Sequence, residues 1–229
     1  MNEFTDLTAN ELATLMRNRA SMYVLLARLY RQEPDDVLIE QLGAMDTSDQ
    51  GTPEIMAGLA KLKICTAMRA DCDLTELAIE FARIFLGTGG QDSAFPYESV
   101  YTSPERLMMQ EARDDVLLQY RREGLDRATR FHEPEDHISL EFEFMAYLCQ
   151  QAALAFENQD GAAASYHFEK QKNFLEQHLL RWVPEFCHDV TRLGRMEFYK
   201  AAAKITADFL LMEGEVIAGN VAHRDEVQT

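Results

Sequence analysis

The chain has 229 residues, and its 39 Asp and Glu against 22 Lys and Arg give a formal net charge of −17 at pH 7. A hydrophobic share of 47% excludes a disordered chain, and the length allows one large domain or two small ones. The charge argues against binding to nucleic acid or to an anionic membrane surface, because both need clustered Lys and Arg. It favours a partner with a basic segment, although acidity that serves only solubility is the commoner explanation.

The first residues, Met1 to Asp6, carry acids where a signal peptide has Lys or Arg, and no apolar run follows them. No stretch approaches the ~18–20 apolar residues of a membrane span. Four cysteines lack the spacing of a metal or redox motif and are expected to be reduced, buried thiols: Cys65, Cys72, Cys149 and Cys187. These features predict a cytoplasmic protein without stable membrane insertion.

Helix signals follow one another along the chain. A capping box from Thr8 to Glu11 starts a first helix, Pro34 opens a short second one, and Pro53 starts a third. Further helices are expected over 73–87, 103–124, 137–158, 161–181, 184–193 and 195–217, with Pro104 and Pro184 at two of the helix starts. No segment shows the alternation of apolar and polar residues that a half-buried strand requires.

The helix expected over 137–158 is predicted to be central, with Asp136 as its N-cap. Its stretch from Ile138 to Phe156 carries only Glu141 and Glu143 as charges and is apolar around most of its circumference, which indicates packing on several sides. The predicted fold is all-α: a single globular, bundle-like domain of about nine or more helices over residues 1–229. A candidate hinge near 124–135 would serve a domain-swapped dimer, and the sequence leaves monomer and dimer open.

Two longer stretches, Thr88–Thr102 and Leu125–Glu135, escape the helical pattern. Irregular segments of this length among short connections usually carry function. Between Phe95 and Tyr101 the first stretch holds three aromatic residues and Val100. These side chains either plug the core or form the rim of a groove for an apolar peptide, and composition leaves both interpretations open.

The second stretch leads into the one block that could be taken for a metal site or a catalytic site. His132 and His137 lie five residues apart rather than four, and Pro134 prevents a regular helix between them, which disfavours zinc. Asp136 and His137 could form an acid–base pair, but the sequence contains neither a nucleophile motif nor a Gly-Lys-Ser/Thr phosphate loop beside them. A helical enzyme or a nucleotide-dependent switch that uses Glu133–His137 is therefore only the alternative interpretation.

Five blocks in a fixed order favour another function. They are Phe81–Gly87, Pro96–Tyr101, Glu133–Ile138, Glu141–Met145 and His178–Phe186. In this combination the chain resembles, over essentially its whole length, the TorD/DmsD family of redox-enzyme maturation chaperones. The Glu-Pro-x-Asp-His and His-Leu-x-x-Trp-x-Pro blocks are the most specific parts.

The resemblance implies an all-helical cytoplasmic chaperone of anaerobic respiration, without enzymatic activity. Members of the family bind the twin-arginine signal peptide of a molybdenum-cofactor oxidoreductase precursor, hold the apo-enzyme ready for cofactor insertion and delay its export. No tightly bound cofactor is implied. Transient binding of a molybdopterin cofactor or of GTP is implied by the resemblance only, since no sequence element supplies either site. The identity of the partner reductase stays open.

The peptide-binding surface that the resemblance implies comprises Phe85, Pro96, Tyr97, Ser99, Val100, Tyr101, Glu133, Pro134, Asp136 and His137. Tyr97 stands where some relatives can have Trp, which bears on partner choice. An apolar groove should set affinity, because burying about four apolar side chains supplies ~6–12 kcal/mol gross, against about 0–1 kcal/mol for each exposed ion pair. Asp136 is expected to contact an arginine and His137 to fix its geometry, with capping and packing as the alternative roles. Tyr97→Ala is expected to weaken peptide binding with little loss of stability.

Overall fold

The computed structural model describes residues 7–45, 52–67, 73–126 and 131–227 of the chain. Its α-helices are α1 (Ala9–Arg31), α2 (Asp36–Ala44), α3 (Pro53–Ala67), α4 (Leu74–Phe85), α5 (Glu98–Thr102), α6 (Glu111–Arg122), α7 (Ile138–Glu157), α8 (Gly161–Phe174), α9 (Leu180–Leu193) and α10 (Glu197–Val227). A 3₁₀ turn, η1 (Gly90–Asp92), follows α4, and a π-helical turn, η2 (Leu175–Leu179), joins α8 to α9. No strand occurs in these ranges, so the all-α prediction is confirmed.

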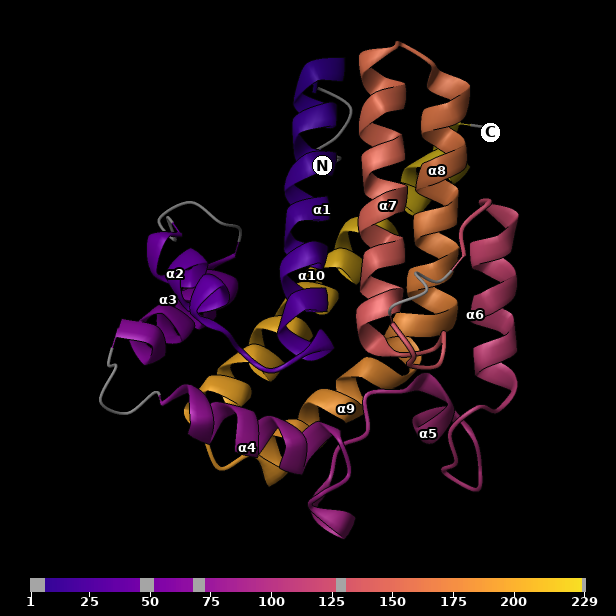
Figure 1. Ribbon diagram of the computed structural model, residues 1–229. Helices are drawn as coiled ribbons and strands as arrows, with labels where there is room; N and C mark the ends of the chain where they lie inside the picture. Colours follow the sequence, from indigo (N-terminus) through magenta and orange to yellow (C-terminus); the bar gives the residue numbers. More distant parts are fainter. Residues whose placement is uncertain (1–6, 46–51, 68–72, 127–130, 228–229) are drawn as a thin grey trace.

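The helices α1, α7 and α8 stand side by side and form the upright part of the molecule, while α10 runs behind them (Figure 1). Below them α9 and α4 cross the bundle, with α2 and α3 on one side and α5 and α6 on the other. The helices α3 and α9 both pack on α10, and α5 packs on α9 and α6. This arrangement puts α5 at the foot of the bundle, where the ends of several helices meet.

The central position predicted for the 137–158 helix is confirmed. Twelve residues of α7 are buried, among them Phe142, Met145 and Leu148, because α1 and α8 cover two sides of the helix. Glu141 is buried as well, as the one charged side chain on the apolar face. A buried carboxyl group in this place needs specific partners, and they belong to the candidate site described below.

A second buried charge ties the upright helices together. The guanidinium group of Arg19 on α1 donates to Glu213 on α10, with 2.8 Å from Nε to Oε1, and to Oε1 of Gln171 on α8. The hydroxyl of Tyr23 donates to the same glutamate at 2.8 Å. Arg19 and Tyr23 both lie on α1, so their bonds fix the position of that helix against α8 and α10.

The region between α4 and α6 differs from the prediction. Residues that were expected to be irregular form α5, and the helix expected from 103 begins only at Glu111. The loop 103–110 lies between them, and in it Arg106 and Met109 have positive φ angles of 52° and 59°. Since the left-handed region does not fit an α-helix, Pro104 marks this loop and not a helix start.

The last helices also start and end at other residues than predicted. Pro184 lies inside α9, which begins at Leu180, and α10 extends to Val227. Val183 and Phe186, on either side of the proline, are fully buried. Their packing holds this stretch against the core, so the loss of one backbone hydrogen bond at Pro184 does not end the helix.

The described helices include none that is long and apolar enough to cross a membrane. Cys149 and Cys187 are free, buried thiols as predicted, and burial raises the pKa of the Cys149 thiol to about 12. Cys65 is free but only half-buried, which departs from the prediction. Cys72 lies outside the described residues, as does part of the candidate hinge near 124–135, which stays a prediction.

Candidate functional site

The two irregular segments of the sequence meet at the foot of α7. Tyr97 and His137 form an isolated antiparallel β-bridge. The backbone N–H of Ile138 donates to the carbonyl of Pro96 at 2.9 Å, and that of Glu98 donates to the carbonyl of Asp136 at 3.0 Å. The structure thus brings together residues about forty positions apart that the sequence analysis had assigned to one surface.

Asp136 caps a different helix from the one predicted. Its Oδ2 accepts a hydrogen bond of 2.9 Å from the backbone N–H of Ser99, in the first turn of α5. The N-cap of α7 is His137, whose Nδ1 accepts from the backbone N–H of Ser139 at 3.1 Å. The prediction that Asp136 is the N-cap of α7 was therefore wrong, because the bridge turns its side chain towards α5.

Both residues are buried, and burial shifts their pKa values. Burial raises the pKa of the Asp136 carboxyl above its usual range, and its Oδ1 has no hydrogen-bond partner among the described residues. Burial lowers the pKa of His137 to about 3, with the positive charge of Arg31 as a second cause. His137 is therefore a neutral imidazole near pH 7, suited to accept a hydrogen bond and not to carry charge.

Tyr97 belongs to the same junction, with only 5% of its surface exposed. Its hydroxyl donates to Glu133, and its ring packs edge-on against His137 at 5.2 Å between centroids. The neighbouring Glu135 forms an ion pair with Arg113 on α6 at 2.6 Å. Tyr97 and Val100 of the aromatic segment are therefore buried in the core, whereas Phe95 and Tyr101 are half-buried, so the segment plugs the core only in part.

The implied peptide-binding residues fall into two groups by exposure. Phe85, Pro96, Tyr97, Ser99, Val100, Asp136 and His137 are buried, whereas Tyr101, Glu133 and Pro134 are half-buried. The ring of Tyr101 packs against Trp182 at 5.6 Å and has the guanidinium of Arg106 over its face at 5.2 Å. The structure thus leaves three of the ten implied residues partly open to a peptide.

A buried acid–histidine cluster lies next to this junction. The carboxylate of Glu98, only 1% exposed, contacts Nδ1 of His178 at 2.9 Å. The indole N–H of Trp182 donates to Oε2 of Glu141 at 3.1 Å. Burial, and then the negative charge of Glu98, raise the pKa of Glu141 well above its usual range. Three carboxyl groups are thus held in a low-dielectric region: those of Glu98, Asp136 and Glu141.

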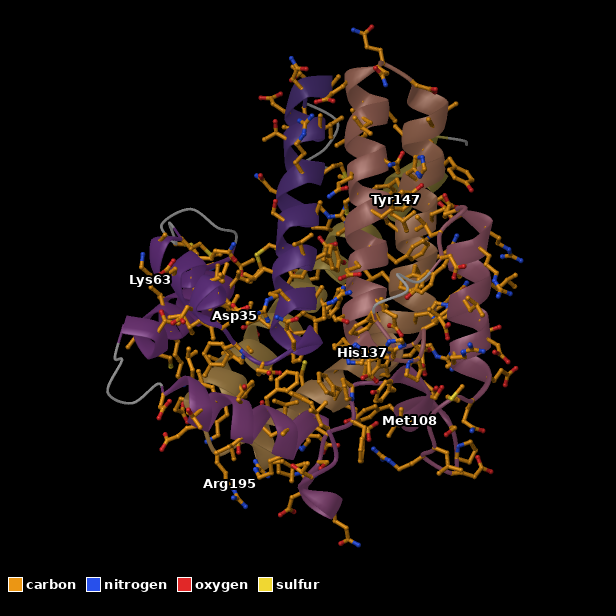
Figure 2. All side chains as sticks on the ribbon, viewed as in Figure 1. Asp35, Lys63, Met108, His137, Tyr147 and Arg195 are labelled. Carbon is orange, nitrogen blue, oxygen red and sulfur yellow. The ribbon has the colours of Figure 1, made fainter. Side chains whose placement is uncertain are left out.

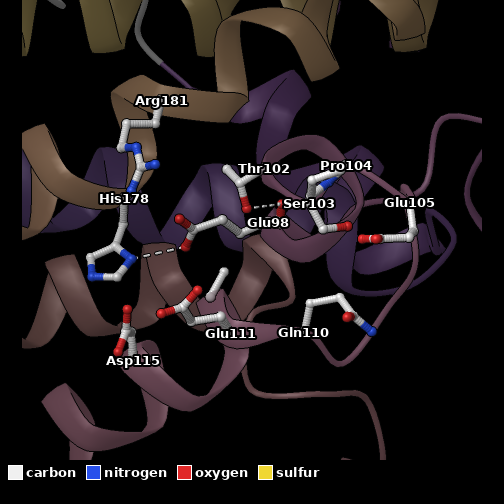
Figure 3. Close-up of a pocket in the computed structure, with 11 residues that line it drawn as sticks. Glu98, Thr102, Ser103, Pro104, Glu105, Gln110, Glu111, Asp115, His178 and Arg181 are labelled. Carbon is white, nitrogen blue, oxygen red and sulfur yellow. Dashed lines mark hydrogen bonds and ion pairs between the residues drawn. The ribbon is translucent and has the colours of Figure 1, made fainter.

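Glu98 and His178 also line a hollow of about 430 Å³ that opens between α5, the loop 103–110, α6 and the start of α9. Figure 3 shows Glu111 and Asp115, both on α6, facing this pair from the opposite wall. Arg181 is the one arginine in the lining. The charged side chains of the lining are thus mainly acids, and the volume of the hollow is in the range of small-ligand sites, about 300–1,000 Å³.

A smaller hollow of about 250 Å³ lies beside α7, above the junction. Its lining includes the aromatic rings of Tyr120, Phe144 and Tyr147 and the charged side chains of Arg31 and Glu143. Figure 2 places Tyr147 midway up α7 and His137 at the foot of that helix. Arg31 is paired with Glu143, so its charge is already compensated.

Neither hollow fits a ligand that carries phosphate groups. The larger one is lined by carboxylates, which repel a phosphate, and the arginine of the smaller one already has an acidic partner. Over the described ranges, no group of three or more His, Cys, Asp or Glu is arranged to hold a metal ion. We therefore derive no function from GTP or from a molybdopterin in these hollows.

The partners of Glu98 and the acidic wall of the hollow were not predicted from the sequence. Glu98 and His178 belong to two separate sequence blocks, and Glu111 and Asp115 belong to none of the five blocks. The spacing of these last two, four residues apart on one helix, shows that they share a face. No sequence pattern showed that this face of α6 lies opposite Glu98, across the hollow.

Residues 47–188 of the chain match the family model described as nitrate reductase delta subunit. The chain belongs to this family. The chaperone protein TorD of Aliivibrio salmonicida is 26% identical over 219 residues, which cover 92% of this chain and 99% of that protein. The chaperone protein TorD of Vibrio cholerae (strain O395) is 29% identical over 210 residues, covering 87% and 92%.

Among solved structures, a protein from Archaeoglobus fulgidus described as a candidate redox enzyme maturation protein is 21% identical, with a TM-score of 0.49 and coverage of 84% of this chain and 93% of that one. The similarity to the TorD proteins extends over nearly the whole chain and confirms the resemblance to the TorD/DmsD family of maturation chaperones. Membership of this family makes the protein a chaperone and not an enzyme, which rejects the alternative of a helical enzyme at Glu133–His137.

Proposed function

We propose that this chaperone binds the twin-arginine signal peptide of an apo-molybdoenzyme precursor in the cytoplasm, assists insertion of the molybdenum cofactor and delays export until the enzyme is loaded. The observation that carries the proposal is the similarity to proteins named chaperone protein TorD over 87–92% of the chain. A net charge of −17 supports it, because a twin-arginine signal begins with basic residues.

The implied binding residues enter the proposal in two ways. Tyr101, Glu133 and Pro134 are partly exposed and can contact a peptide in the present conformation. The buried residues, Tyr97 and Asp136 among them, reach a peptide only if the two joined segments move apart. Without such a movement they act by shaping the surface next to them. Transient binding of GTP or a molybdopterin stays a prediction from the resemblance.

The test is calorimetric titration of the chaperone with a synthetic twin-arginine signal peptide and with a control peptide in which Gln-Gln replaces Arg-Arg. The proposal predicts saturable binding of the first peptide and clearly weaker binding of the second. Co-purification of a tagged chaperone from anaerobically grown cells should in addition recover a molybdoenzyme precursor that retains its signal peptide. Absence of peptide binding in calorimetry, together with recovery of no such precursor, would refute the proposal.

A further inference from the structure

Three carboxylates of the large hollow have no cationic partner among the described residues. Glu105 on the loop 103–110, and Glu111 and Asp115 on α6, are exposed and form no ion pair with any of those residues. On the same helix, Arg113 uses its charge on Asp114 and Glu135, away from this group. No ion pair within the described part of the chain thus compensates these three carboxylates, and Arg181 is the one arginine beside them in the lining.

A buried carboxylate adds to this charge from within. Glu98, only 1% exposed, lines the hollow, and its carboxylate contacts Nδ1 of His178 at 2.9 Å. Charges in a low-dielectric wall focus the field in the opening. A cation that enters the hollow therefore meets the field of four lining carboxylates, with Arg181 as the one opposing arginine in the lining.

An exposed apolar edge adjoins the acidic hollow. Leu107 is 56% and Met109 is 62% exposed, and Met108 between them, which is labelled in Figure 2, is exposed as well. The loop is held in place at both ends: Oγ of Ser103 accepts from the N–H of Leu107 at 3.3 Å, and Oγ of Ser99 accepts from the N–H of Gln110 at 3.1 Å. Methionine side chains adapt to apolar partners of varied shape.

We infer that these two features form one docking surface, defined by Glu98, Glu105, Glu111 and Asp115 together with Leu107, Met108 and Met109. The hollow receives the two consecutive arginines of the signal peptide, and the apolar edge receives the apolar residues that follow them. The inference rests on the proposed function and deepens it, because it places the peptide on a surface outside the residues implied by the family resemblance, Glu98 being adjacent to them. Charge complementarity selects this occupant: guanidinium groups donate several hydrogen bonds to carboxylates that approach from different directions.

The decisive variant removes two charges from the exposed wall, Glu111→Gln with Asp115→Asn. The matched control removes two exposed charges from α2, Asp36→Asn with Glu40→Gln, so that both variants carry the same net charge of −15, from −17 + 2. Each protein is titrated calorimetrically with the Arg-Arg and the Gln-Gln peptide. We expect the hollow variant to bind the Arg-Arg peptide about 5- to 30-fold more weakly, the control less than twofold more weakly, and neither to change binding of the Gln-Gln peptide.

A second pair of variants tests the apolar edge. Leu107→Ser should weaken binding of both peptides, because the apolar part is common to them, whereas Leu211→Ser, at a 65% exposed site on α10, should not. Melting temperatures check that each variant is folded. If Glu111→Gln with Asp115→Asn does not fold, Glu105→Gln on the loop replaces it, with an expected weakening of about two- to fivefold.

The outcomes separate this inference from the proposed function. If the wild-type chaperone does not bind the Arg-Arg peptide, the proposed function fails. If it binds and the hollow variant binds equally well, the function stands and the docking surface is wrong. Equal losses in the hollow variant and in the α2 control would show a general effect of net charge and would also overturn the docking surface.

Discussion

The carboxylate of Asp136 links the most specific sequence block to α5, and its removal should cost stability. In Asp136→Ala the backbone N–H of Ser99, now bonded at 2.9 Å, is left buried without an acceptor. An unsatisfied buried donor costs about 1–3 kcal/mol. For a chain of this size about 1 kcal/mol corresponds to ~2–4 °C, so the melting temperature should fall by about 2–12 °C. Asp136→Asn keeps an acceptor oxygen and should stay within about 1 kcal/mol of the wild type.

The assay is a guanidinium titration at pH 7 followed by circular dichroism, with peptide titrations on the same samples. The side chain of Ser99 is also involved: its hydroxyl oxygen accepts a hydrogen bond from the backbone N–H of Gln110, at the end of the loop 103–110. We therefore expect Asp136→Ala to weaken peptide binding as well as stability, and Asp136→Asn to preserve both. Asp136 is in this view a positioning residue that acts through α5.

Two results would refute this reasoning. If Asp136→Asn and Asp136→Ala lose stability equally, the acceptor is not what matters at this position. If Asp136→Asn is as stable as the wild type but no longer binds the Arg-Arg peptide, the charge of Asp136 contacts the peptide directly, as the family resemblance implies.

The remaining predictions concern the aromatic junction and the buried glutamate. Tyr97→Ala should lower the free energy of unfolding by about 3–5 kcal/mol, measured by denaturant titration, because the ring is buried; this replaces the expectation of little loss. Tyr97→Phe, which loses only the bond to Glu133, should cost about 0.5–1.5 kcal/mol. Burial raises the pKa of Glu141, so folding takes up a proton and wild-type stability should fall from about pH 5 upwards, by at most ~1.4 kcal/mol per pH unit. Glu141→Gln, which can still accept from Trp182, should lack this slope in titrations between pH 5 and 8.

The features that the sequence predicted correctly depend on neighbouring residues. The capping box of α1 is formed by Thr8 and Glu11, three positions apart, and the central place of α7 follows from its apolar circumference. Both signals are complete within one helix. The same is true of Asp35, whose side chain caps α2 next to Pro34, the residue that predicted this helix start.

The errors arose where the deciding contact comes from elsewhere in the chain. Asp136 is of a residue type and at a position typical of an N-cap of α7. Its carboxylate oxygen instead accepts a hydrogen bond from the backbone N–H of Ser99, 37 positions away. The loop 103–110 has the sequence of a helix start at Pro104, but Ser99 and Ser103 hold it in an irregular conformation. A local sequence pattern does not predict such distant hydrogen-bond partners, because their positions are set only when the helices pack into the bundle.

The same distinction separates the residues of a strong motif from the residues that touch a ligand. Asp136 and His137 are buried, each serves one backbone N–H, and a buried cap tolerates few residue types. To attract a basic peptide, the acidic wall of the hollow needs only negative charge at a given place in the fold. No short sequence motif encodes such a position. The two are connected through Ser99, whose N–H is held by Asp136 and whose hydroxyl holds the loop that carries the apolar edge. On this argument the Glu133–His137 block shapes the docking surface from behind, and the peptide contacts the surface that the block supports.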